Sequence, residues 1–181
     1  EAVIEGAFRG IQKAAELIDM SKHSGEHPRM GATDVCPLIP VANISMEETV
    51  AFAKKLAKRV GEELNIPVYL YEEAQPNKKR SNLSVIRSGE YEGIANKIGQ
   101  AEWKPDFGPA KFNAASGNTA IGARDFLIAY NINLNSTSTR IANRIAFDVR
   151  EAGRVQREGN PYSGKVVKDA NGEDVRVPGS L

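Results

Sequence analysis

The sequence predicts a mixed α/β sandwich, because apolar positions switch between helical and strand spacing along the chain. Three- and four-residue steps indicate amphipathic helices, and short apolar runs bounded by Pro, Asn and Gly indicate strands between them. None of these strands is followed by a dinucleotide-binding glycine fingerprint. The predicted fold class is therefore α+β.

The composition of the chain excludes several classes of protein. The chain has 181 residues, of which 41% are hydrophobic and 26% charged, as in ordinary soluble globular proteins. A formal net charge of +1 gives no electrostatic reason to expect a nucleic acid or an anionic membrane as partner. One cysteine excludes an internal disulfide and suits a reducing cytoplasm, and no apolar run is long enough to cross a bilayer.

The first expected element is a helix over residues 3–18, where apolar side chains recur at helical steps. A loop then leads into a mostly apolar strand at 35–41. Pro37 and Pro40 interrupt that strand, and proline in sheets is confined to edges and bulges. We therefore expect this strand at an edge or a bulge.

A capping box at residues 45–48 predicts the start of a second helix. Its apolar face is formed by Ala53, Leu56, Ala57, Val60 and Leu64. A proline-containing turn at 65–67 ends it, and a short strand is expected at 68–71. Residues 75–81 are polar and are expected to form a solvated loop, with an anion site on its three basic residues as the alternative.

The second half of the chain is less regular. Residues 90–103 begin as a helix and then break, and residues 105–122 are rich in Gly, Asn, Ser and Pro, which predicts a long loop. Residues 126–134 alternate apolar and polar side chains and form the clearest predicted strand. A helix over 136–151 with an inward apolar face and a hairpin over 166–177 complete the chain. The chain opens without methionine directly into a helical pattern and stops without a closing element, so we expect an internal piece of a longer protein.

The candidate chemistry lies in residues 23–37, which contain both histidines and the only cysteine. Gly25 and Gly31 weaken a helix, and Pro28 pushes His27 toward an extended conformation. We therefore expect a constrained loop that carries imidazole, carboxylate and guanidinium groups on a rigid edge, where binding and catalytic residues often lie.

Three interpretations of this loop compete. Residues 23–27 fit the zinc pattern H-x-x-E-H, but that pattern needs a continuous helix, so no metal is expected. Cys36 with His27 and Asp34 would make a thiol nucleophile, but cysteine in an apolar run is more often a small buried hydrophobe. His27 as a general base is favoured, because imidazole exchanges a proton near neutral pH. A histidine that only pins the loop by hydrogen bonds is an equal alternative on composition alone.

Long motifs in this chain resemble the formiminotransferase family. The most specific is His-Ser-Gly-Glu-His-Pro-Arg-Met-Gly-Ala-Thr-Asp-Val-Cys-Pro, which starts at residue 23. Arg-Ser-Gly-Glu-Tyr-Glu and Trp-Lys-Pro-Asp-Phe-Gly-Pro are two more. The resemblance is carried by residues 23–40, 66–71, 87–92, 103–109, 122–124, 126–134 and 150–154.

The resemblance implies two α/β subdomains, each a ferredoxin-like split βαβ sandwich, with a folate-binding crevice between them. On this basis residues 1–125 form the N-terminal subdomain without its opening strand and helix. Residues 126–181 form the truncated start of the C-terminal subdomain. The implied activity is that of a glutamate formimidoyltransferase, which moves a formimidoyl group between N-formimidoyl-L-glutamate and tetrahydrofolate in histidine degradation.

The resemblance also implies a site. The family's catalytic histidine carries over to His27, and tetrahydrofolate serves as co-substrate with no metal. Lys111 and Asn113 lie in the more variable middle of the implied folate loop, so their individual contacts stay open. The implied folate-binding residues are Gly108, Pro109, Ala110, Lys111, Phe112, Asn113, Ala114, Ala115, Ser116 and Gly117.

Several alternatives remain at this point. Phe112 either packs beside the folate or anchors its loop onto the core, and Arg29 either grips a substrate carboxylate or pairs within the protein. A formyltransferase on the same scaffold and a non-catalytic folate-binding module are the competing functions. The expected partners are small-molecule substrates in the cytoplasm, with no nucleic acid and no membrane, and a homo-oligomer stays open.

Overall fold

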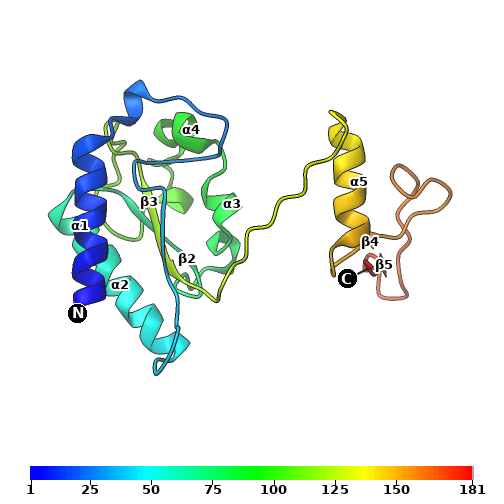
Figure 1. Ribbon diagram of the computed structural model, residues 1–181, viewed down its shortest axis with the longest axis horizontal. Coiled ribbons are helices and arrows are strands. Elements are labelled where there is room, and N and C mark those ends of the chain that lie inside the picture. Colours follow the sequence, from blue (N-terminus) through cyan, green and yellow to red (C-terminus); the bar gives the residue numbers. More distant parts are fainter. Residues whose placement is uncertain (181) are drawn as a thin grey trace. The chain divides into compact units, whose positions relative to one another are not determined.

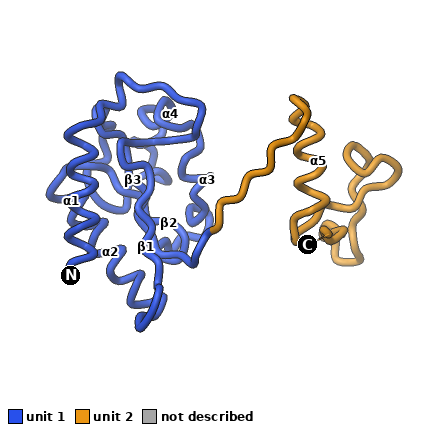
Figure 2. The backbone as a smooth tube through the Cα atoms, viewed as in Figure 1, with its two compact units in different colours: residues 1–127 blue, residues 128–181 orange. Residues whose placement is uncertain are grey.

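The structure, a computed structural model, describes residues 1–180. The chain forms two compact units that divide between residues 127 and 128 (Figure 2). Among the described residues, no helix combines the length and the apolar character needed to cross a membrane. Each unit is considered by itself.

The first unit alternates helices and short strands as predicted (Figure 1). Its capping box is formed as expected: the Ser45 hydroxyl accepts the Glu48 N–H at 3.2 Å, and the Glu48 carboxylate accepts the Ser45 N–H at 2.8 Å. Short 3₁₀ turns lie at Met20–Lys22, Lys78–Arg80 and Ala101–Trp103. The longer elements are α1 (Ala2–Leu17), β1 (Val35–Leu38), α2 (Met46–Glu63), β2 (Val68–Glu72), α3 (Leu83–Ile86), α4 (Glu90–Lys97) and β3 (Thr119–Ala123).

The three strands form one parallel sheet in the order β1-β3-β2. The expectation of an edge position for the proline-containing strand is confirmed, because β1 is an outer strand. The central strand corrects the sequence analysis, which placed residues 119–122 in a long loop. All five residues of β3 are buried, so the strand shows no alternation of apolar and polar side chains that would reveal it. Strand β3 lies between β1 and β2 and is parallel to both. In a split βαβ unit, the strand between the two parallel strands is antiparallel to them.

Helices cover both faces of this sheet. Side chains that alternate along the strands separate two cores: Leu70 and Ile121 point to one face, and Tyr69 and Ala120 point to the other. Helices α1 and α2 close the first core with residues such as Ile4, Phe8, Leu56 and Val60. Helices α3 and α4 contribute Ile86 and Ile94 to the second. The mixed α/β prediction is confirmed.

The polar segment 75–81 is the expected solvated loop only in its middle, where residues 76–79 are exposed, while Gln75 and Arg80 near its ends are held to the domain. Gln75 is buried, and its amide donates to the carbonyl of Leu70 and to Asp106, both at 3.0 Å. The Arg80 guanidinium pairs with Asp106 at 2.8 Å. Asp106, which is distant in sequence, accepts a hydrogen bond from each of these two side chains and so compensates part of the cost of burying them.

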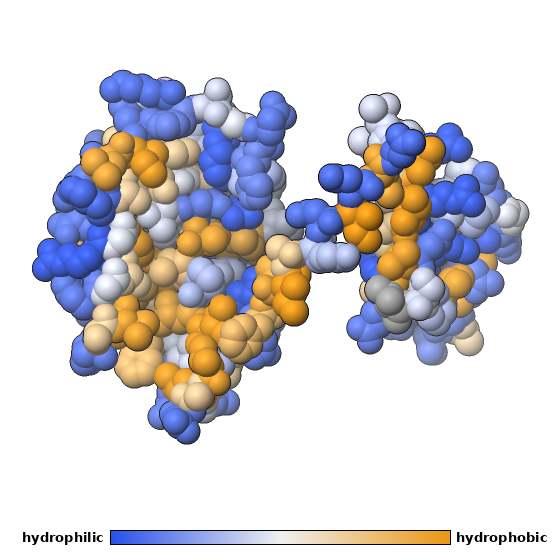
Figure 3. Space-filling model, in the orientation of Figure 1, coloured by the Kyte–Doolittle hydropathy of each residue, from blue (hydrophilic) through white to orange (hydrophobic). Residues whose placement is uncertain are grey.

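The second unit contains α5 (Thr139–Val149) and the antiparallel strands β4 (Arg154–Val155) and β5 (Arg176–Val177). The predicted hairpin is confirmed by the pairing of Lys168 with Asp174 and by a positive φ of 81° at Gly172. The predicted inward face of α5 is wrong, since none of its residues is buried and apolar side chains show along it (Figure 3).

The clearest predicted strand is also wrong. Residues 126–134 have no regular secondary structure, and Ile128 is 87% exposed. A strand is stable only when its N–H and C=O groups bond to a neighbour. No described residue pairs with this segment, so its alternating pattern has nothing to pack against.

Candidate functional site

His27 lies on the surface in an irregular segment between α1 and β1. Residues 23–29 are not helical, as the glycines and proline predict, so the H-x-x-E-H spacing does not place both imidazoles on one helix face. The Nδ1 atom of His27 lies 2.8 Å from the carbonyl oxygen of Pro28. Because a carbonyl oxygen only accepts hydrogen bonds, this contact assigns the proton of the neutral imidazole to Nδ1 and the lone pair to Nε2. The exposed imidazole therefore presents Nε2 as its proton acceptor.

The residues after His27 anchor the segment to the domain. Met30 is almost fully buried in the second core, and its N–H donates to the Asp34 carboxylate at 2.9 Å. The other carboxylate oxygen of Asp34 pairs with Arg87. His27 therefore lies three residues from a point that packing and a charged hydrogen bond hold in place.

Backbone hydrogen bonds join the histidine segment to the end of the 108–117 loop. Gly31 and Gly117 form an antiparallel bridge. On either side of it, Ala32 N–H donates to the Ser116 carbonyl and Asn118 N–H donates to the Met30 carbonyl, both at 2.9 Å. The structure therefore brings together the two segments that the sequence analysis singled out separately.

The 108–117 loop begins and ends at glycines with positive φ angles, 80° at Gly108 and 65° at Gly117. Asn113 shapes its second half, where its carbonyl accepts the Gly117 N–H at 2.8 Å and its side chain accepts the Ser116 N–H at 3.1 Å. Ser116 and Gly117 are buried, and Pro109, Phe112 and Asn113 are half-buried. The exposed residues of the loop are Gly108, Ala110, Lys111, Ala114 and Ala115.

Arg29 is already paired within the protein. Its guanidinium donates to both oxygens of Glu92, at 2.6 and 3.1 Å, and to Glu90 at 3.2 Å. These hydrogen bonds hold the pKa of the Glu92 carboxyl below its usual range. Of the two interpretations of Arg29, pairing with a helix is the one that the structure favours.

Sequence reasoning missed Tyr91 as a site residue. Its backbone N–H donates to the Arg29 carbonyl at 2.8 Å, and its hydroxyl donates to the Ala114 carbonyl at 2.6 Å. Tyr91 lies in the motif at residues 87–92, which is part of the family resemblance but was given no role. That motif is the feature of the sequence that could have pointed to it.

Cys36 lies in β1 and packs against the first core. Burial raises the pKa of its thiol, which keeps the sulfur protonated and poorly nucleophilic. Within residues 1–180, no three His, Cys, Asp or Glu side chains are grouped closely enough to hold a metal ion.

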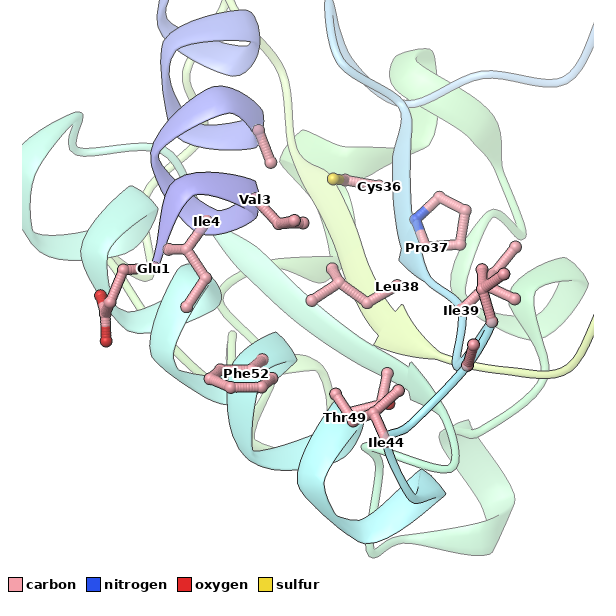
Figure 4. A pocket seen from close by; sticks show the side chains of 13 residues that line it. Glu1, Val3, Ile4, Cys36, Pro37, Leu38, Ile39, Ile44, Thr49 and Phe52 are labelled. Carbon is pink, nitrogen blue, oxygen red and sulfur yellow. The ribbon is translucent and has the colours of Figure 1, made fainter.

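Several hollows lie on the first unit, and two of them bear on the site. One of about 480 Å³ borders the histidine segment at Pro28 and is lined by residues of α3, α4 and the turn between them, including Arg87 and Glu90. The other, of about 400 Å³, is an apolar groove at the free edge of β1, between α1 and α2 (Figures 3 and 4). The apolar groove contains none of the predicted site residues, whereas the hollow at Pro28 borders the residue next to His27.

The fold and the site together define an α/β domain in which the segment of the exposed His27 imidazole is hydrogen-bonded to the end of the 108–117 loop. Comparison with known families identifies it. A model described as the formiminotransferase domain, N-terminal subdomain, matches residues 1–124, and one described as the formiminotransferase domain matches residues 129–179. The chain belongs to the formiminotransferase family.

Curated relatives carry the same activity in their names. The chain is 58% identical to formimidoyltransferase-cyclodeaminase of Mus musculus over 85% of this chain and 28% of the relative. It is 52% identical to glutamate formimidoyltransferase of Thermoplasma acidophilum over 81% of this chain and 49% of the relative. For the Streptococcus pyogenes enzyme of that name, the identity is 44% over 84% and 51%. The chain thus spans about half, or less, of the length of these relatives.

Proposed function

We propose that this chain is the part of a glutamate formimidoyltransferase that holds the general base and one wall of the tetrahydrofolate site. The whole enzyme transfers a formimidoyl group between N-formimidoyl-L-glutamate and tetrahydrofolate in histidine degradation, as a cytoplasmic enzyme with small-molecule partners. The observation that carries the proposal is the backbone pairing between the His27 segment and the 108–117 loop. Residues 1–125 and 126–181 belong to successive subdomains of that enzyme.

The chemistry requires a group that can take and return a proton. An amine of tetrahydrofolate attacks the trigonal formimidoyl carbon, and the nitrogen of glutamate leaves from a tetrahedral intermediate. The attacking amine loses a proton and the leaving amine gains one. Nε2 of His27 is suited to both transfers, because Nδ1 is held as a donor by the Pro28 carbonyl. The steps need no covalent nucleophile.

The surroundings of His27 suit this role. The imidazole is exposed, so a substrate reaches it without a rearrangement of the core. The hollow beside Pro28 offers room next to it for a small substrate. Both substrates carry glutamate-type carboxylates, but Arg29 is occupied by Glu90 and Glu92, so we expect other donors to bind those groups.

The decisive experiment is an assay of the full-length protein with tetrahydrofolate and each of two donors, N-formimidoyl-L-glutamate and N-formyl-L-glutamate. Mass spectrometry identifies the folate product. We expect the formimidoyl product to form at least tenfold faster than the formyl product. Preference for the formyl donor would support the formyltransferase alternative, and folate binding without either product would support a non-catalytic binding module.

A further inference from the structure

Tyr91 is the residue that contacts both halves of the candidate site. It lies in the first turn of α4, on the face of the sheet that carries the second core. The histidine segment precedes it by about sixty residues and the 108–117 loop follows it by about twenty. One side chain and its own backbone therefore connect two regions that are distant in sequence.

The backbone of Tyr91 holds the histidine segment. The first N–H groups of a helix have no partner within the helix, and α4 has no side-chain cap. The Tyr91 N–H donates instead to the Arg29 carbonyl at 2.8 Å. The Arg29 side chain bonds to Glu90 and Glu92, which flank Tyr91. The start of α4 therefore holds both the backbone and the side chain of Arg29, two residues after His27.

The side chain of Tyr91 holds the 108–117 loop. Its hydroxyl donates to the Ala114 carbonyl at 2.6 Å, and its ring packs on Phe112 with 5.4 Å between ring centroids and 53° between the planes. Burial raises the pKa of the Tyr91 hydroxyl, which keeps it a donor. The exposed middle of the loop is therefore attached to α4, although its own residues include little that packs in the core.

We propose that Tyr91 is a positioning residue, which holds the folate-binding loop at the distance from His27 that the transfer requires. This inference rests on the proposed function of the site. The distance between a folate on the loop and the imidazole would then be set by a chain of contacts. The loop bonds to the Tyr91 side chain, the Tyr91 backbone bonds to Arg29, and Arg29 lies two residues after His27.

The substitution Tyr91→Phe tests the hydroxyl alone, because it keeps the ring and the backbone N–H. In the full-length protein we expect the KM for tetrahydrofolate to rise about fivefold, the effect of losing one typical hydrogen bond. The KM for N-formimidoyl-L-glutamate should stay within twofold. A purely structural role would lower the amount of active enzyme, which reduces the apparent kcat and leaves both KM values unchanged.

Tyr69→Phe is the matched control. The Tyr69 hydroxyl also donates to a backbone carbonyl at 2.6 Å, that of Trp103, and its ring also lies in the second core. It touches neither the histidine segment nor the 108–117 loop through that bond. We expect a loss of thermal stability and unchanged KM values. An equal rise in the tetrahydrofolate KM for both variants would overturn the assignment to Tyr91.

A second readout does not depend on activity. Lys111 is exposed in the loop, so trypsin cleaves after it when the loop opens, and the cleavage rate follows the population of the open form. We expect Tyr91→Phe to raise that rate about fivefold and Tyr69→Phe to leave it unchanged. Unchanged cleavage and an unchanged folate KM in Tyr91→Phe would overturn the inference. An inactive unsubstituted enzyme would overturn the proposed function instead, while the cleavage rates still decide whether Tyr91 holds the loop.

Discussion

Gly31 and Gly117 lie opposite each other in an antiparallel bridge that leaves no room for a side chain on either residue. A Cβ atom on Gly31 would lie 2.1 Å from the Asn118 carbonyl oxygen, and one on Gly117 would lie 2.2 Å from the Met30 carbonyl oxygen. The bridge joins the segment that carries His27 to the end of the 108–117 loop. The two glycines therefore permit the close backbone approach on which the candidate site depends.

We expect Gly31→Ala to lower the free energy of unfolding by about 2 kcal/mol, because backbone atoms that cannot rotate away must shift. Urea denaturation measures the change. Gly10→Ala in α1 is the control: nothing lies within 4 Å of its Cβ position, so alanine should stabilise the helix by about 1 kcal/mol. Equal stability of the two variants would show that the close approach is not part of the native structure.

Replacing His27 by Ala should lower the turnover of the full-length enzyme at least a hundredfold, as expected for loss of a general base. Tetrahydrofolate affinity, measured by calorimetry, should change little, because the proposed folate contacts come from the 108–117 loop, whereas the His27 imidazole bonds to the neighbouring Pro28 carbonyl.

His23→Ala is the control for that prediction, since His23 is also exposed and lies four residues earlier. We expect it to retain most of the activity. Normal turnover in His27→Ala would remove the general-base role. Equal losses in both variants, together with bound zinc by elemental analysis, would favour a metal shared by the two histidines.

Asp106 is predicted to matter for stability although it lies in a loop. Its carboxylate accepts the Leu70 N–H at 2.8 Å, the Gln75 amide at 3.0 Å and the Arg80 guanidinium at 2.8 Å. Asp106→Asn removes the charge and leaves Arg80 without its anionic partner in a largely buried place. We expect a loss of about 3 kcal/mol in the free energy of unfolding by urea denaturation.

Glu62→Gln is the control for Asp106→Asn, because it removes the charge from an exposed ion pair instead of a buried one. Glu62 pairs with Lys58 at 3.9 Å, and both side chains are more than half exposed. Exposed pairs contribute about 0.5 kcal/mol or less, so this variant should unfold close to the unsubstituted protein. If the two variants lose the same amount, the Asp106 network is solvated rather than buried.

We expect the free energy of unfolding to fall at alkaline pH, because two tyrosines are buried. Burial raises the pKa of Tyr69 and of Tyr71 from 10.0 to about 12. The folded state thus keeps phenols neutral that the unfolded state ionises. Their contribution is fully present below about pH 10 and is lost as the pH rises to about 12, on the order of 2 kcal/mol for each tyrosine.

Urea denaturation between pH 9 and pH 12 measures this effect. Tyr69→Phe should make the decline shallower by about half of the tyrosine contribution. Tyr130→Phe, in which the replaced residue is 81% exposed, should leave the slope unchanged and controls for the removal of a solvated phenol. A slope unaffected by Tyr69→Phe would contradict the burial of its hydroxyl.

Local sequence patterns were sufficient for some elements. The apolar spacing of α1 and α2, the capping box at Ser45 and the turn at Gly172 depend on residues within a few positions of each other. The edge position of β1 also follows from the sequence, because Pro37 has no N–H to donate to a neighbouring strand.

Strand β3 and residues 126–134 show the limit of such patterns. β3 is a strand because β1 and β2 bond to it on both sides, although two of its five residues are alanine and one is glycine. Residues 126–134 have the stronger β pattern and no partner among the described residues. Pairing depends on a second segment, which periodicity in the first does not reveal.

The same division holds for the site. The sequence by itself determined that His27 lies in a non-helical loop, and the family resemblance singled out residues 108–117. Only the tertiary structure showed that these segments meet at Gly31 and Gly117, that Arg29 is paired with Glu90 and Glu92, and that Tyr91 contacts both segments. Local conformation follows from the preferences of adjacent residues. The meeting of distant segments follows from the packing of the whole sheet and its helices, which no single stretch of sequence encodes.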